Sequence, residues 1–394
     1  MSAPLLNAID PRIVTPPPGL EFDNFKNADG ASIRHAMVPP AAGKMINGKP
    51  VGVAVVVTGF RESIERYFEL MRDLSERGYA VHAMDWRGQG GSQRYNPDLP
   101  QRPNAQGYEN DVADLSQFVT EVIKPKQRYG QDAPVTLFAH SMGGNLALRY
   151  LHEHQDQMDA AVITAPMMQI RTGWMPPWAA RQISKIAEYF GAGDRYLPGT
   201  GDWHERELKS LQRINCNREI RQNLQTLFYR DMPENRMGGP TFAWLREAFR
   251  SIAIVRDPKF LSEIRTPIFL ATAGRDKLVS TSATHKAAKH LPNVQVEHFK
   301  DGLHSLWMEH DSIRDRLWNL TDRFLNRTLG IPIPVPNTTK DCCANDNACT
   351  APASKQVRLP SGPEHHKRPA PPVIDPATMP VPILRPQRLP RLTA

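Results

Sequence analysis

The segment TLFAHSMGGNLALRYL, residues 136–151, holds the serine best placed for chemistry. A run typical of a strand ends at Ser141, and a run typical of a helix follows at once. A sharp strand-to-helix turn is the context in which a serine hydroxyl is presented as a nucleophile. The turn needs small residues two positions before and after the serine, here Ala139 and Gly143. Ala139 departs from the usual glycine by one methyl group. We therefore predict that Ser141 is a nucleophile in an elbow formed by Ala139, His140 and Gly143.

A serine nucleophile needs a base, and the base needs a carboxylate that orients it. The expected chain order after such an elbow is serine, acid and histidine, with the last two on loops that follow later strands. Asp276 follows the strand-like run TPIFLATAG and His304 follows VQVEHF, so we predict these two as acid and base. Asp301 is a rival acid, but it lies too close to His304 in the same loop to orient it. His140 is expected to point away from the serine.

Hydrolysis through a serine also needs N–H donors for the oxyanion of the tetrahedral intermediate. Met142, directly after the nucleophile, should supply one. The second should come from the loop after the strand-like run VGVAVVVTG, where Gly59 lets the backbone turn and Phe60 offers its N–H. Arg61 follows. It could meet a phosphate or carboxylate of the substrate if it points inward, or lie solvated on the loop surface.

The pattern of strand-like and helical segments that must position these residues predicts an α/β fold. Strand-like runs are expected at residues 51–59, 79–86, 134–140, 160–166, 266–274 and 294–299. Helical periodicity lies between them, as in residues 62–78, where Gly78 is placed to end the helix. Near-continuous apolar strands that alternate with helices predict a mostly parallel central sheet with helices on both faces.

Strand patterning breaks between residues 167 and 261, a segment rich in tryptophan and other aromatic residues. We predict a helical insertion here, at the sheet edge where ligands bind, and call it the cap. Trp174, Trp178 and Trp244 are candidate substrate contacts. The expected organisation is an extension (1–30), a first core part (31–166), the cap (167–261), a second core part (262–330) and a tail (331–394).

Charge and composition narrow the class of protein. The formal net charge is +8, but the Pro-rich tail carries eight Lys or Arg against four Asp or Glu, so the body is only mildly basic. That distribution argues against a nucleic-acid partner. Three of the four cysteines lie in the tail and match no standard zinc spacing. The N-terminus lacks the pattern of a secretory signal. We expect a cytoplasmic protein, with peripheral contact at the inner membrane face left open.

Other motifs do not indicate a cofactor. DWRGQGGSQR, residues 85–94, is superficially like a dinucleotide glycine loop, but Gln93 takes the place of the third glycine and no helix follows. The sequence contains neither GxxxxGK[ST] nor HExxH. We therefore expect no nucleotide, no metal and no other cofactor. The composition does not indicate an oligomeric state.

With the elbow, Asp276 and His304 identified, the chain resembles the α/β-hydrolase superfamily over about residues 31–329. Within it, the chain is similar to the group of monoacylglycerol lipases and bacterial lysophospholipases. The resemblance also rests on TGFRES…DWRGQGGS, on GGPTFAWLREAF in the cap and on the helix HSLWMEHDSIRDRLWNL. It implies Ser141 as nucleophile, His304 as base, Asp276 as orienting acid, and Phe60 and Met142 as oxyanion donors. Thr58 stands where the group usually has histidine.

The expected activity is therefore hydrolysis of a carboxylic ester, with a small single-chain lipid ester such as a lysophospholipid or monoacylglycerol as substrate. The aromatic cap would supply an apolar pocket for the acyl chain and could face a membrane. Alternatively, its aromatic residues form only the core of the cap, without lipid contact. A peptidase of the proline-aminopeptidase type is an alternative, favoured by acidic cap residues Glu188, Glu205, Glu207 and Glu219. A non-catalytic hydrolase-fold binding protein is the alternative of a different class. Haloalkane dehalogenase chemistry would need a carboxylate in place of Ser141.

Overall fold

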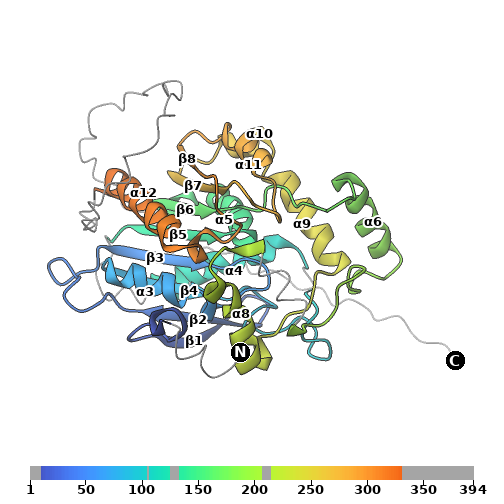
Figure 1. Ribbon diagram of the computed structural model, residues 1–394, viewed down its shortest axis with the longest axis horizontal. Coiled ribbons are helices and arrows are strands. Elements are labelled where there is room, and N and C mark those ends of the chain that lie inside the picture. The colour runs from blue at the N-terminus through green and yellow to red at the C-terminus, as the bar shows by residue number, and fades with distance from the viewer. Residues whose placement is uncertain (1–9, 104–105, 125–132, 206–213, 331–394) are drawn as a thin grey trace, which may run out of the picture. The chain divides into compact units, whose positions relative to one another are not determined.

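The protein is built on one eight-stranded sheet with strand order β1-β2-β4-β3-β5-β6-β7-β8 (Figure 1). The computed structural model describes residues 10–103, 106–124, 133–205 and 214–330. The predicted tail, residues 331–394, lies outside the described residues. The strands are β1 (Glu21–Lys26), β2 (Ser32–Val38), β3 (Gly52–Val57), β4 (Tyr79–Met84), β5 (Val135–His140), β6 (Ala160–Thr164), β7 (Ile268–Ala273) and β8 (Val294–Phe299).

The sheet is parallel from β4 through β8 and antiparallel only where β2 joins β1 and β4. Every residue of β3, β5 and β7 is buried. Runs that are apolar on both faces are the mark of parallel strands covered by helices on each side. The predicted fold class, a mostly parallel sheet with helices on both faces, is confirmed.

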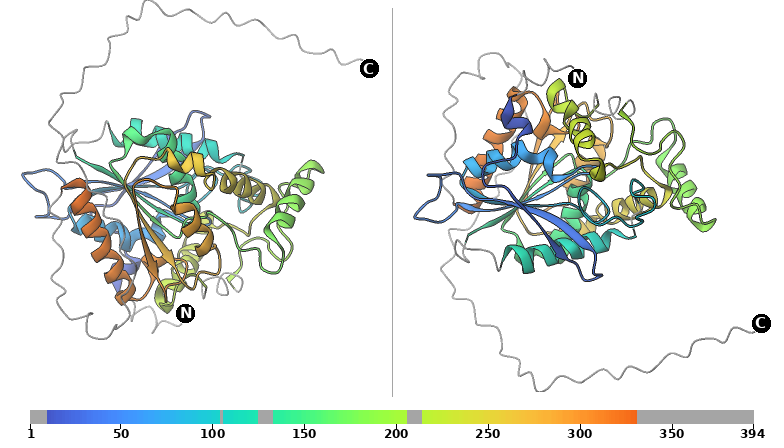
Figure 2. Two further views of the ribbon diagram at one scale, coloured as in Figure 1. Left: turned by 90° about the horizontal axis from the view of Figure 1, so that it is seen from above. Right: turned by 90° about the horizontal axis from the view of Figure 1, so that it is seen from below.

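Successive side chains of a strand point to opposite faces of the sheet, so each central strand contributes to two separate cores. In β3, Val55 belongs to the core formed with α4 and α5, while Val56 belongs to the opposite core formed with α3 and α12 (Figure 2). The helices of the described residues are α2 (Pro11–Val14), α3 (Phe68–Glu76), α4 (Tyr108–Gln117), α5 (Met142–Glu153), α6 (Pro177–Tyr189), α8 (Glu219–Asp231), α9 (Phe242–Ile254), α10 (Pro258–Ser262), α11 (Thr281–Ala288) and α12 (Asp311–Leu329), with short helical turns η1 (Ile64–Tyr67), η2 (Phe118–Ile123), η3 (Gln155–Gln157), η4 (Pro233–Asn235) and η5 (Leu306–Met308).

The strands at the antiparallel edge were missing from the sequence prediction. β1 pairs with β2 from Glu21↔Met37 to Lys26↔Ser32, so the sheet begins well before residue 31. The proposed boundary between an extension and the core at residue 30 is therefore wrong. β1 is an edge strand with largely exposed side chains, and such a strand lacks the apolar run by which buried strands are recognised.

The helix predicted between the first two core strands is present and ends as expected. It begins as the 3₁₀ turn η1 and continues as α3. Gly78 follows with φ +91°, a backbone conformation in which glycine is favoured because it has no Cβ. This strand–helix–strand unit places the loop after β3 at the carboxyl edge of the sheet, beside the elbow after β5.

The segment between β6 and β7 holds α6, α8, α9 and α10. Its described residues take part in two isolated β-bridges, Ile170↔Val279 and Tyr196↔Thr241, and form no strand. α6 and α9 lie beyond the carboxyl edge of the sheet, on the side of the elbow (Figure 1). Among the helices in the described ranges, none is both long enough and apolar enough to cross a membrane.

Candidate active site

Ser141 occupies a strained turn between β5 and α5. Its φ of +55° and ψ of −115° lie in a region that non-glycine residues rarely adopt. The backbone holds it there, because Ser141 N–H donates to the carbonyl oxygen of Thr164 at 3.1 Å. A Cβ on Gly143 would lie 2.5 Å from the carbonyl oxygen of Thr58, which explains the need for glycine at this position. Ala139 is 2% exposed, so little room remains beyond its methyl group.

The structure brings the three predicted residues into one hydrogen-bonded chain. His304 Nε2 lies 2.8 Å from Ser141 Oγ, and His304 Nδ1 lies 2.7 Å from Asp276 Oδ2. Asp276 comes from the loop after β7 and His304 from the loop after β8. Asp301, the rival acid, is exposed, and its carbonyl oxygen accepts a hydrogen bond from Asn217.

Asp276 is held as a carboxylate by its surroundings. Burial by itself would raise its pKa, but the charge and hydrogen bond of His304 lower it below the ordinary value. The backbone N–H groups of Leu278 and Val279 add to this effect by donating to Asp276 Oδ1 at 2.8 and 2.9 Å. Stabilising an anion in this position fixes the imidazole tautomer with Nε2 toward the serine.

His140 lies beside the ring of His304, while the expectation that it points away from Ser141 stays a prediction. Its ring centroid lies 4.8 Å from that of His304, and its Nδ1 contacts the carbonyl and hydroxyl oxygens of Thr164 at 3.2 and 3.1 Å. Burial lowers the pKa of His140 to about 4. The ring is therefore neutral near pH 7 and does not oppose a positive charge on His304.

The two predicted oxyanion donors come from segments that meet beside the serine. Met142 is the first residue of α5, so its N–H lies outside the hydrogen-bond ladder of the helix. Phe60 follows Gly59, and a Cβ on Gly59 would lie 3.3 Å from Ser141 Cβ. The loop before Phe60 thus passes directly against the nucleophile.

Glu62, which the sequence analysis did not single out, holds this loop in place. Its Oε2 accepts from Gly59 N–H at 2.7 Å and from the Tyr67 hydroxyl at 2.5 Å, and its Oε1 pairs with Arg66 Nε at 3.1 Å. Burial would raise the pKa of Glu62, but the charge of Arg66 and these two hydrogen bonds lower it. A buried glutamate three residues after a glycine turn leaves no distinctive sequence signal.

A cavity of about 260 Å³ opens over the serine. The cap contributes Met167, Ile170, Pro240 and Trp244 to its wall, which is mainly apolar. The prediction that Trp174 and Trp178 contact substrate is not supported, because they are 91% and 71% exposed and neither lines this cavity. Arg61 does line the cavity and is 8% exposed, so the alternative that its side chain is solvated on the loop surface is wrong.

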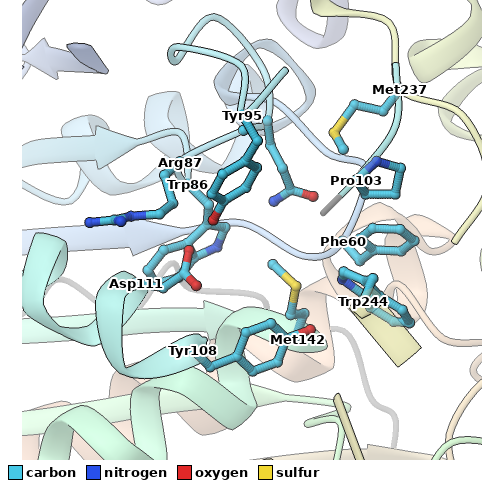
Figure 3. A pocket seen from close by; sticks show the side chains of 12 residues that line it. Phe60, Trp86, Arg87, Tyr95, Pro103, Tyr108, Asp111, Met142, Met237 and Trp244 are labelled. Atoms are coloured by element: carbon cyan, nitrogen blue, oxygen red, sulfur yellow. The ribbon is translucent and has the colours of Figure 1, made fainter. Parts of the chain in front are cut away.

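A second, much smaller pocket (Figure 3) shares Phe60 and Trp244 with the first as lining residues. The two rings stack with centroids 4.0 Å apart and line both spaces. The small pocket also contacts the Met142 side chain, but its volume of about 20 Å³ has room for roughly one water molecule. The larger cavity, which includes Ser141 and His304, is therefore the candidate active site.

A mostly parallel sheet that presents a strained serine, with an acid and a histidine on later loops, defines an α/β hydrolase. The chain belongs to the family described as serine aminopeptidase S33, whose model matches residues 48–311. It is 31% identical over 293 residues to lysophospholipase L2 of Escherichia coli strain K12, covering 70% of this chain and 80% of that protein. It is 28% identical over 293 residues to probable lysophospholipase L2 of Haemophilus influenzae, covering 74% and 87%.

Solved structures share the same fold. A soluble variant of monoglyceride lipase from Saccharomyces cerevisiae, in complex with a substrate analogue, matches with a TM-score of 0.64 at 18% identity. That match covers 80% of this chain and 97% of the other chain. The predicted resemblance to α/β hydrolases of the lysophospholipase and monoacylglycerol lipase group is confirmed.

The assignment of the acid can be tested by a pair of matched substitutions. Asp276→Asn should lower kcat for an activated ester by roughly three to four orders of magnitude, because the amide no longer stabilises the imidazolium or its tautomer. Asp301→Asn should leave kcat nearly unchanged. Both variants should keep the wild-type melting temperature within a few degrees, measured by circular dichroism. A large loss in Asp301→Asn with activity retained in Asp276→Asn would contradict the assignment.

Proposed function

We propose that this protein hydrolyses the carboxylic ester of a lipid with one acyl chain, with Ser141 as nucleophile. The observation that carries this proposal is the hydrogen-bonded chain from Asp276 through His304 to Ser141 at the wall of a largely apolar cavity. A cavity of about 260 Å³ with an apolar wall suits a flexible chain better than a small polar ester.

The mechanism follows from the positions of these groups. His304 takes the proton of Ser141 as the hydroxyl oxygen attacks the ester carbonyl carbon. The N–H groups of Phe60 and Met142 bind the oxyanion, and the N-terminus of α5 adds a favourable dipole. His304 then gives its proton to the leaving alcohol. A water molecule activated by the same imidazole attacks the acyl-enzyme and releases the fatty acid, which restores Ser141.

Names of relatives support lipid esters as the substrate class. The family description refers to aminopeptidases, whereas the relatives include lysophospholipases L2 and monoglyceride lipases. A peptidase that seats a free amine needs acidic groups in the cavity. Glu188 and Glu205 instead pair with Arg246 and Arg230. Glu219 does not line the cavity, and the carboxylate that does, Glu62, pairs with Arg66. Glu207 lies outside the described residues. An ester substrate therefore fits this cavity better than a peptide with a free amine.

The activity can be tested with a substrate panel. Purified protein should hydrolyse p-nitrophenyl esters, lysophospholipid and monoacylglycerol, and should leave an aminoacyl anilide untouched, because the cavity offers an acyl wall rather than an amine site. Ser141→Ala should abolish all of these reactions. Preference for the anilide would overturn the ester assignment, and undiminished turnover by Ser141→Ala would overturn the mechanism.

We further propose that the cap, residues 167–261, contacts a lipid surface through α6 and its flanking residues. Six large apolar side chains here are exposed: Trp174, Trp178, Ile183, Ile186, Tyr189 and Phe190. Arg181 and Lys185 are exposed on the same helix. Exposed tryptophan and phenylalanine beside basic residues are typical of helices that lie in a membrane interface and favour anionic lipids.

Vesicle sedimentation tests this contact. The protein should bind vesicles that contain phosphatidylglycerol more strongly than pure phosphatidylcholine vesicles, and Trp178→Ser with Tyr189→Ser should weaken binding several-fold by removing interfacial apolar area. The double variant should hydrolyse a water-soluble p-nitrophenyl ester at the wild-type rate, since neither residue lines the cavity. Equal vesicle binding by variant and wild type would contradict the proposed surface.

A further inference from the structure

A buried glutamine of α8 has an unpaired side-chain amide at the candidate active site. Gln225 is 2% exposed and lines the cavity over Ser141. Neither its Nε2 nor its Oε1 forms a hydrogen bond with any group of the described residues. Burial of an unpaired amide is unfavourable, and most buried polar groups in folded proteins are paired. An unpaired amide at the wall of this cavity is therefore suited to direct contact with a substrate.

The face of α8 that carries Gln225 packs against the core. Arg221 and Tyr229 lie four residues before and after Gln225, so the three side chains share one face of the helix. Arg221 pairs with Glu69 of α3 at 2.7 Å. The Tyr229 hydroxyl donates to the carbonyl oxygen of Arg61, in the loop after β3, at 2.8 Å. Gln225 is thus held between two anchored residues, one of which contacts the loop that also carries a proposed oxyanion donor.

The chemistry of an amide narrows the group that Gln225 can bind. Its Nε2 offers N–H donors and its Oε1 offers acceptor lone pairs. A hydroxyl group can satisfy both atoms, because it donates one hydrogen bond and accepts others, whereas an ionised phosphate or carboxylate only accepts. In an ester with one acyl chain, the chain is apolar, and the carbonyl oxygen is bound by the proposed donors Phe60 and Met142. A free hydroxyl of the alcohol part is the group that remains for Gln225.

We infer that Gln225 binds a free hydroxyl in the alcohol part of the substrate, and so selects esters of glycerol over esters of plain alkyl alcohols. This inference rests on the proposed ester hydrolysis. Lysophospholipids and monoacylglycerols both carry such a hydroxyl, so the contact serves either lipid. The anchors on each side of Gln225 hold the amide in place before the substrate binds, which reduces the loss of conformational freedom on binding.

Two water-soluble esters with the same acyl chain and different alcohols test this contact. Wild type should have a higher kcat/KM for monobutyrylglycerol than for propyl butyrate. Gln225→Met keeps the length of the side chain and removes its amide, so it should lower the ratio of the two kcat/KM values roughly tenfold, as expected when a buried hydrogen bond is lost. Gln222→Met is the matched control on the same helix. Gln222 donates to the Cys216 carbonyl oxygen and does not line the cavity, so this variant should leave the ratio unchanged.

Two hydroxypropyl esters identify which hydroxyl is bound. 2-Hydroxypropyl butyrate keeps the hydroxyl next to the ester, which both lipids carry. 3-Hydroxypropyl butyrate keeps the end hydroxyl, which a lysophospholipid has esterified to phosphate. A selective loss in Gln225→Met on the first ester would support a contact that serves both lipids. A loss confined to the second ester would support the hydroxyl contact but overturn its use for lysophospholipids.

Thermal unfolding gives a second readout that needs no hydrolysis. Because the amide of Gln225 is unpaired in the free protein, Gln225→Met should keep or raise the melting temperature. A marked fall would indicate a structural role and overturn the inference. An unchanged substrate ratio in Gln225→Met, or an equal loss on monobutyrylglycerol and propyl butyrate, would overturn the role of Gln225 while leaving ester hydrolysis intact. Failure of wild type to cleave any ester would instead overturn the proposed function itself.

Discussion

The structure depends on a close contact between backbone segments at the carboxyl edge of the sheet. Gly143, in the first turn of α5, lies so near the Thr58 carbonyl oxygen that a Cβ would come within 2.5 Å of it. This approach brings the elbow of Ser141 against the loop after β3, and so brings both proposed oxyanion donors to one point. The buried strands β3 and β5 are parallel neighbours, which makes the contact possible. Positioning of the nucleophile is thus a consequence of sheet order.

Charged groups buried around this contact are held in the states that the proposed chemistry needs. Asp276 stays anionic because His304 and two backbone N–H groups offset the cost of its burial. Glu62 stays anionic beside Arg66 and fixes Gly59. His140, with its pKa lowered to about 4, stays neutral beside His304. Asp276 and His140 contact residues more than twenty positions away in the chain, so their states require the complete fold.

The sequence predicted those features that leave a local pattern. The apolar strands around Val55 and the elbow at Ser141 are visible because burial and a strained turn restrict residue type. β1 was missed because an exposed edge strand carries no such restriction. Trp174 and Trp178 were misplaced because aromatic type alone does not distinguish a cavity wall from an exposed cap surface. Glu62 was missed although its partners Gly59, Arg66 and Tyr67 lie within five residues of it, because that spacing is not specific for a buried carboxylate.

The proposed catalysis requires that His304 activates Ser141 for attack on an ester. Labelling with a fluorophosphonate, which reacts with activated serine hydroxyls, followed by mass spectrometry of the peptides measures this activation. In wild type, a stoichiometric adduct should form on the peptide that contains Ser141. His304→Ala, folded as judged by its melting temperature, should react orders of magnitude more slowly. Rapid labelling of another residue, or undiminished labelling of Ser141 in His304→Ala, would contradict the activation of Ser141 by His304.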